Sequence, residues 1–212
     1  MTLALPPQGD ATRLVLVRHA ETDPALRGRC YGRLDVALSE EGHRQAGALG
    51  TALRAVPLTA VYSSPLARAL ATAAPIAAGH HLEPVVEKDL RELDFGELEG
   101  LGYEEISASR PELFRTWMET PASVRFPGGE SFGDLRRRVL ATVVVIEERH
   151  PGEAVAVVAH GGVVRVVLAR ALGLADGAVF RLDQAYGGVS VVDRLPGAAV
   201  VRVVNTLLYS RA

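Results

Sequence analysis

The sequence predicts an α/β protein in which a mostly parallel sheet of about six strands lies between two layers of helices, a three-layer α/β/α sandwich. Three observations lead to this fold class. Short aliphatic and β-branched runs alternate with helical patterns along the 212 residues. The runs at 14–17 and 154–159 are apolar at every position, as in parallel strands buried on both faces. No repeat, low-complexity tract or linker interrupts the pattern, so we expect a single domain over residues 1–212.

The first predicted strand, residues 12–17, is an aliphatic run that stops at Arg18 and His19. A polar loop containing glycines follows it. Ser39 is a suitable helix N-cap and is followed by two glutamates, which favour the first turn of a helix. We therefore predict a helix over residues 39–55.

The second predicted strand covers residues 60–63. Ser64 and Pro65 after it have the composition of an N-cap and a first helical residue, and predict an alanine-rich helix that runs to about Ala78. Pro75 lies inside this helix and is expected to kink its last turn.

A third strand is predicted over residues 83–87, followed by an acidic, glycine-containing loop over 90–100. The pattern over 103–118 is typical of short helices broken at Pro111. We expect this part of the chain, about residues 100–130, to form a helical cap outside the sheet.

The last part of the chain repeats the strand, loop and helix order. A helix is predicted over 131–150, and a strongly apolar strand over 154–159. An apolar helix follows over 163–172, and the runs at 189–192 and 199–204 could form a closing pair of strands.

Composition excludes several classes of function. The formal net charge is −2 with no block of like charges, which argues against binding to nucleic acid or to anionic membranes. Cys30 is the only cysteine, so neither an internal disulfide nor a cysteine-ligated zinc site is possible. The first residues do not form a secretory signal, and no apolar run is long enough to span a bilayer. We therefore expect a soluble, cytoplasmic protein.

Two histidines follow buried strands at equivalent positions. His19 follows the first strand and His160 follows the strand over 154–159, which places both where an open α/β sheet binds its ligands. Arg18 precedes one histidine, and Arg68 lies in the first turn of a helix, where backbone N–H groups favour an anion. These residues indicate an anion site, although a lone arginine on a helix is more commonly a surface residue.

Several sequence blocks resemble the signatures of the histidine phosphatase superfamily, the phosphoglycerate mutase-like proteins. The first is Arg18-His19-Ala20-Glu21-Thr22, similar to the Arg-His-Gly-Glu-Thr signature. Similar blocks follow in the family's order at 32–42, 62–69, 90–100, 127–132 and 158–162. The resemblance spans most of the chain and implies the phosphoglycerate mutase-like fold.

The resemblance assigns roles that position alone does not. It implies that His19 is a nucleophile that forms a phosphohistidine, and that Glu92 is the proton donor. The residues implied to bind the phosphoryl oxygens or the substrate are Arg18, Arg68, His160, Thr22 and Gly161. Neutral imidazole is a good nucleophile, and this chemistry requires neither a metal nor a cofactor.

Two positions depart from the family pattern. Ala20 replaces the usual glycine after the nucleophile, and Ala25 stands where the mutases have an asparagine near the phosphate. The second change favours a phosphatase that acts on a small organic phosphomonoester. Residues 29–36 resemble the α-ribazole phosphatases, so α-ribazole 5′-phosphate is one candidate substrate, with broad specificity as another.

Alternatives remain open. A cofactor-dependent phosphoglycerate mutase uses the same phosphohistidine, and a noncatalytic member would only bind phosphorylated ligands. The cap residues Tyr103, Phe114 and Trp117 could equally be packing or a substrate wall. Residues 200–208 are apolar enough for core or for the edge of a homodimer.

Overall fold

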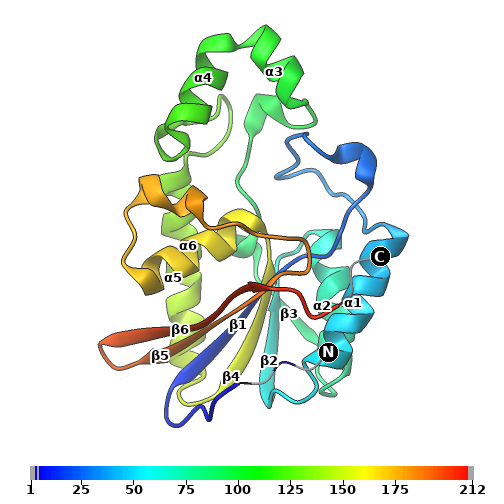
Figure 1. Cartoon of the computed structure of the whole chain (residues 1–212), viewed down its shortest axis with the longest axis vertical. Helices are drawn as coiled ribbons and strands as arrows, with labels where there is room; N and C mark the ends of the chain where they lie inside the picture. Colours follow the sequence, from blue (N-terminus) through cyan, green and yellow to red (C-terminus); the bar gives the residue numbers. More distant parts are fainter. Residues whose placement is uncertain (1–2, 4, 210–212) are drawn as a thin grey trace.

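The computed structural model describes residue 3 and residues 5–209, and a single six-stranded sheet lies at its centre (Figure 1). The strand order is β3-β2-β4-β1-β5-β6. The strands are β1 (Thr12–Arg18), β2 (Leu58–Ser63), β3 (Pro84–Val86), β4 (Ala154–Ala159), β5 (Val189–Leu195) and β6 (Ala198–Thr206). Strands β1 to β4 pair in parallel, while β5 and β6 add an antiparallel hairpin beside β1. The predicted mostly parallel sheet is confirmed.

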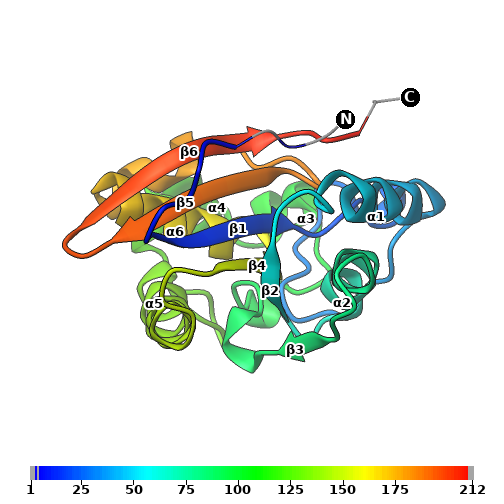
Figure 2. The same ribbon diagram turned by 90° about the horizontal axis from the view of Figure 1, so that it is seen from below.

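Helices cover both faces of the sheet (Figure 2). On one face lie α1 (Glu40–Ala52) and α2 (Ala67–Ala78), and on the other lie α5 (Phe132–Arg149) and α6 (Gly161–Leu172). Successive residues of β1 point to opposite faces: Val15 and Val17 pack with α1 and α2, while Leu14 and Leu16 pack with α5 and α6. Burial of both faces explains why β1 is apolar at four consecutive positions, Leu14 to Val17.

The start of α2 differs from the prediction. Ser64 and Pro65 do not cap this helix, which begins at Ala67 with Leu66 at the N-cap position. The Ser64 hydroxyl is instead bonded to the His160 ring at 2.8 Å. A carboxylate oxygen of Asp35, from a distant loop, accepts the hydrogen bond of the Ala67 N–H at 2.7 Å. A tertiary contact thus replaces the local cap.

The start of α6 also differs from the prediction. The helix begins at Gly161, directly after His160, rather than at Val163. His160 therefore occupies the N-cap position, and the first N–H groups of α6 face the end of the sheet where β1 and β4 terminate.

The predicted helical cap forms two helices, α3 (Tyr103–Ser109) and α4 (Pro111–Glu119), at one end of the molecule (Figure 1). Trp117 is buried at its base, where its ring centroid lies 5.1 Å from that of Phe126. Short 3₁₀ helices connect the larger elements at Pro24–Leu26, Lys88–Leu90, Gly96–Leu98, Pro121–Ser123 and Asp176–Arg181.

The apolar stretch over residues 200–208 lies mostly in β6, the edge strand of the sheet. Its side chains are mostly half-buried, and Leu208 is buried against the core. The homodimer stays a prediction. Within residues 5–209, the helices are all too short or too polar to cross a bilayer.

Candidate active site

His19 directly follows β1, and its backbone is fixed on both sides. Its N–H donates to the Ala159 carbonyl at 2.8 Å, and its carbonyl accepts the Gly187 N–H at 3.1 Å. The Nδ1 atom of the ring lies 2.8 Å from the Ala20 carbonyl oxygen. Because a carbonyl can only accept, Nδ1 carries the proton and Nε2 keeps its lone pair. The ring is thus held as the tautomer that could attack through Nε2.

His160 is held by a different partner. Its Nε2 atom lies 2.8 Å from the Ser64 hydroxyl, which also accepts the Leu66 N–H at 3.4 Å. The serine hydroxyl can donate its proton to Nε2, and in that arrangement the histidine proton is on Nδ1. That Nδ1 atom is buried and has no hydrogen-bond partner among the described residues. The rings of His19 and His160 lie 5.2 Å apart, edge to face.

Both histidines are neutral at pH 7. Burial, reinforced by the positive charges of Arg18 and Arg68, lowers the pKa of His19 well below its usual value. Burial also lowers the pKa of His160, with contributions from Arg68, His19 and Arg18. A neutral His19 is the form that acts as a nucleophile.

Arg68 is fully buried and is fixed by a loop. Its two terminal nitrogens donate to the carbonyls of Leu34, Tyr31 and Gly32 at 2.7–3.0 Å. These carbonyls orient the guanidinium of Arg68. Because they carry no net charge, they leave its positive charge uncompensated. Its Nε atom is buried and has no partner within the described part of the chain.

Arg18 has a similar arrangement on the other side of the site. Its Nη1 donates to the Gln184 carbonyl at 2.5 Å, and its guanidinium lies 4.1 Å from the ring centroid of Tyr186. The Nε atom is again buried without a partner among the residues described. A buried, unsatisfied donor costs about 1–3 kcal/mol, so three of them around one histidine indicate a site built for an anion.

Glu92 reaches the same site from the loop before the cap. Its carboxylate accepts the Leu93 N–H at 2.9 Å on one oxygen and the Gly162 N–H at 3.0 Å on the other. The second bond comes from the first turn of α6, where a carboxylate is favoured. A Cβ at Gly162 would lie 2.3 Å from Glu92 Oε1, so only glycine leaves room for this carboxylate.

A partly buried ion pair holds the Glu92 loop in place. Arg138 of α5 donates to the carbonyls of Asp89, Arg91 and Glu92 at 2.7–2.9 Å. The same guanidinium pairs with Glu130 at 2.7 Å, and this pairing, against the effect of burial, lowers the pKa of Glu130. Sequence reasoning gave Arg138 no role, because an arginine in a helical pattern has no signal of its own.

A cavity of about 290 Å³ brings together most of the predicted residues, although His160 is not among the residues that line it. It is lined by Arg18, His19, Arg68, Glu92 and Gly161 of the predicted set. Further lining residues that the sequence did not single out for the site are Leu26, Gly28, Arg29, Tyr31, Phe95, Arg165 and Tyr186. Four arginines and a single carboxylate among the described lining residues make the cavity suited to an anion.

The remaining predicted residues lie close to this cavity. The Thr22 hydroxyl lies 3.1 Å from the Tyr31 hydroxyl, which in turn lies 2.5 Å from that of Tyr186. Burial raises the pKa of Tyr31 to about 12. Of the cap aromatics, Tyr103 lines the cavity whereas Trp117 is packing.

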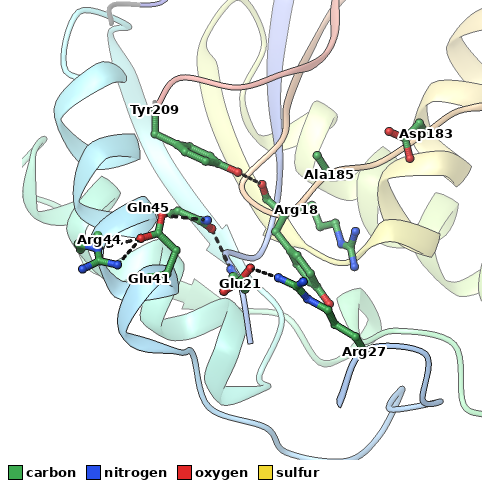
Figure 3. Close-up of a pocket in the computed structure, with 10 residues that line it drawn as sticks. Arg18, Glu21, Arg27, Glu41, Arg44, Gln45, Asp183, Ala185 and Tyr209 are labelled. Carbon is green, nitrogen blue, oxygen red and sulfur yellow. Dashed lines mark hydrogen bonds and ion pairs between the residues drawn. The ribbon is translucent and has the colours of Figure 1, made fainter. Parts of the chain in front are cut away.

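Figure 3 shows the residues that line a second hollow, of about 620 Å³. Arg18 and Tyr186 line both this hollow and the first cavity. Its other arginines are paired: Arg27 with Glu21 at 2.9 Å, and Arg44 with Glu41 at 2.5 Å. His19 lines the first cavity and does not line this larger hollow, so we assign the chemistry to the first cavity.

Comparison with known proteins identifies the family of the chain. Residues 14–207 match the family model of the histidine phosphatase superfamily, branch 1. Phosphoserine phosphatase 1 of Hydrogenobacter thermophilus is 40% identical over 162 residues, which cover 76% of this chain and 77% of the relative. A structure of a putative α-ribazole-5′-phosphate phosphatase from Escherichia coli superposes with a TM-score of 0.84 at 27% identity, over 95% of this chain and all of the other.

Some relatives are longer than this chain. A bifunctional protein of Mycobacterium tuberculosis is 39% identical over 204 residues, covering 95% of this chain but 56% of the relative. The chain thus spans about half the length of that protein.

Proposed function

The chain belongs to branch 1 of the histidine phosphatase superfamily, and from this premise we propose that it hydrolyses small organic phosphomonoesters through a phosphohistidine on His19. The observation that carries the proposal is the set of three buried, unpartnered nitrogens on Arg18, Arg68 and His160 that surround a neutral His19, within the described residues. They would satisfy the oxygens of a phosphoryl group.

In the first step, the Nε2 lone pair of His19 attacks phosphorus. The N–P bond forms as the P–O bond to the leaving alcohol breaks, and Glu92, which must enter this step protonated, gives its proton to the leaving oxygen. Arg18, Arg68 and His160 hold the three phosphoryl oxygens throughout, which stabilises the charge of the transition state.

In the second step, water attacks the phosphohistidine. Glu92, now a carboxylate, accepts a proton from the water as its oxygen bonds to phosphorus, and the N–P bond breaks. Inorganic phosphate leaves, and His19 and Glu92 return to their starting states. Thr22 does not contact the phosphoryl group in this proposal; its hydroxyl bonds to that of Tyr31, which lines the cavity.

The test is phosphate release from a panel of phosphomonoesters with EDTA present. The panel contains p-nitrophenyl phosphate, phosphoserine, 3-phosphoglycerate and α-ribazole 5′-phosphate. We expect turnover by the wild type and a loss of about 10³-fold or more for His19→Ala, with circular dichroism unchanged. A phosphoenzyme trapped under alkaline conditions should be absent from the variant.

Three results would contradict the proposal. Retained activity in His19→Ala would remove the nucleophile assignment. Isomerisation of 3-phosphoglycerate that depends on 2,3-bisphosphoglycerate, without hydrolysis of the panel, would show a mutase. Tight phosphate binding with neither turnover nor phosphoenzyme would show a noncatalytic binding protein.

A further inference from the structure

Arg165 is a charged residue in the cavity that the proposed reaction does not use. It projects from α6, one helical turn after Gly161. Its Nε donates to the Leu182 carbonyl at 2.9 Å, and its guanidinium lies 5.8 Å from the ring centroid of Phe180. Among the described residues, its two terminal nitrogens, Nη1 and Nη2, have no hydrogen-bond partner.

Each of the other arginines of the cavity has at least one terminal nitrogen bonded to the protein. Both terminal nitrogens of Arg68 and the Nη1 of Arg18 donate to backbone carbonyls. Arg29 donates to the Gly100 carbonyl and pairs with Glu105 at 3.0 Å. Arg165 differs because, within the described chain, neither of its terminal nitrogens makes a hydrogen bond or an ion pair. Only the outer edge of its guanidinium is available, which is the edge that binds a carboxylate through two parallel hydrogen bonds.

Burial without a partner is unfavourable for a cation. Arg165 is half-buried, and this loss of solvent lowers its pKa, against the attraction of Glu92 and Asp183. Binding of an anion would offset the free energy that the guanidinium loses when it is removed from solvent.

The position of Arg165 relative to the phosphoryl donors limits where that anion lies. From the point where a Cβ of Gly161 would be, Arg165 Nη1 is 3.1 Å away and Arg18 Nε is 3.7 Å away. Gly161 has no side chain between them. A group bound by Arg165 therefore lies close to the phosphoryl group, within one small molecule.

We propose that Arg165 binds a carboxylate of the substrate, so that the cavity selects phosphate esters of small hydroxy acids. The carboxylate stands on the α or β carbon relative to the ester oxygen, which fits the short distance and the cavity of about 290 Å³. This inference rests on the proposed phosphatase function and adds the class of substrate. Arg165 acts on specificity and leaves the chemistry at His19 unchanged.

Two pairs of substrates isolate the carboxylate. Phosphoserine and phosphoethanolamine differ only by that group, and 3-phosphoglycerate is compared with glycerol 3-phosphate. We expect the wild type to favour the carboxylated member in kcat/KM. Arg165→Gln should lower kcat/KM on that member by about 10- to 100-fold, mainly through KM, as for a lost charged hydrogen bond. The kcat/KM on the member that lacks the carboxylate should change by less than about threefold, so the preference disappears.

The control is Arg170→Gln, the same change on the same helix, at a residue that pairs with Glu147 away from the cavity. It should leave the preference intact. Arg165→Lys keeps the positive charge and should retain part of the preference for the carboxylated substrate. This variant also provides the test if Arg165→Gln does not fold.

The inference fails if the wild type shows no preference in either pair. It also fails if Arg165→Gln lowers kcat/KM by the same factor on both substrates of a pair, because Arg165 would then bind the transferred phosphoryl group. Failure of the phosphatase function itself is distinct: p-nitrophenyl phosphate would then not be hydrolysed and no phosphohistidine would form.

Discussion

Gly162→Ala should impair the reaction while leaving the fold intact. The new Cβ would lie 2.3 Å from Glu92 Oε1 and 3.0 Å from a methyl carbon of Leu135. Ordinary contact begins near 3.4 Å, so the carboxylate must move by about 1 Å, and a shift of that size costs about 10²-fold in rate. This corresponds to about 2.7 kcal/mol of transition-state free energy. Because the atoms that must move are the ends of flexible side chains, we expect little change in the free energy of unfolding.

The assay compares two leaving groups. On phosphoserine, whose alkoxide must be protonated as it leaves, kcat should fall by about 10²-fold. On p-nitrophenyl phosphate, whose leaving group needs no proton, the fall should be less than about tenfold. The control is Gly47→Ala in α1, where the new Cβ meets nothing within 4 Å; it should keep full activity and gain about 0.5–1 kcal/mol of stability. Unchanged phosphoserine turnover in a folded Gly162→Ala would refute the account of how Glu92 is placed.

Three further predictions concern the same groups. Glu92→Gln should lower kcat on alkyl phosphates by about 10²-fold or more and on p-nitrophenyl phosphate by far less; equal losses would contradict its role as the acid. Ser64→Ala removes the partner of His160 Nε2 and should lower kcat/KM by about tenfold, measured with phosphoserine. Both histidines have lowered folded-state pKa values, so below about pH 6.5 only the unfolded chain gains their protons. The stability that they provide above pH 6.5 is lost as pH falls, by up to about 1.4 kcal/mol per unit for each histidine. Urea unfolding from pH 7 to 5.5 should therefore show a smaller loss for His160→Gln than for the wild type, and equal losses would contradict the burial argument.

The strands could be predicted because burial on both faces of the sheet leaves a continuous apolar run that is visible in the sequence. The run over residues 12–17 became β1, and that over 154–159 became β4. Helix starts were less predictable. Ser64-Pro65 has the composition of a cap, but the Ser64 hydroxyl bonds to His160, which lies 96 residues further along the chain. A local signal cannot show which of two partners a hydroxyl will bind.

The core of the candidate site followed from motifs, whereas its walls did not. His19, Glu92 and the other three residues of the phosphoryl site carry signatures that identify them in order along the chain. Tyr31 and Tyr186 become neighbours only through the fold, with hydroxyls 2.5 Å apart. Arg165 has a weak signal, as a charged residue within the apolar run of α6, but nothing in the sequence shows that the run faces the cavity.

The division between the phosphoryl site and its walls has an evolutionary consequence. The phosphoryl donors stand at strand ends and helix starts, deep in the structure, where a change disturbs many contacts. Leu26, Arg29 and Tyr103 of the cavity wall come from loops and from the cap, where substitutions are tolerated. A duplicated copy of this gene could thus acquire a new substrate through changes at the wall while it keeps the same chemistry. Selection for a new metabolic role would then require neither a new nucleophile nor a less stable fold.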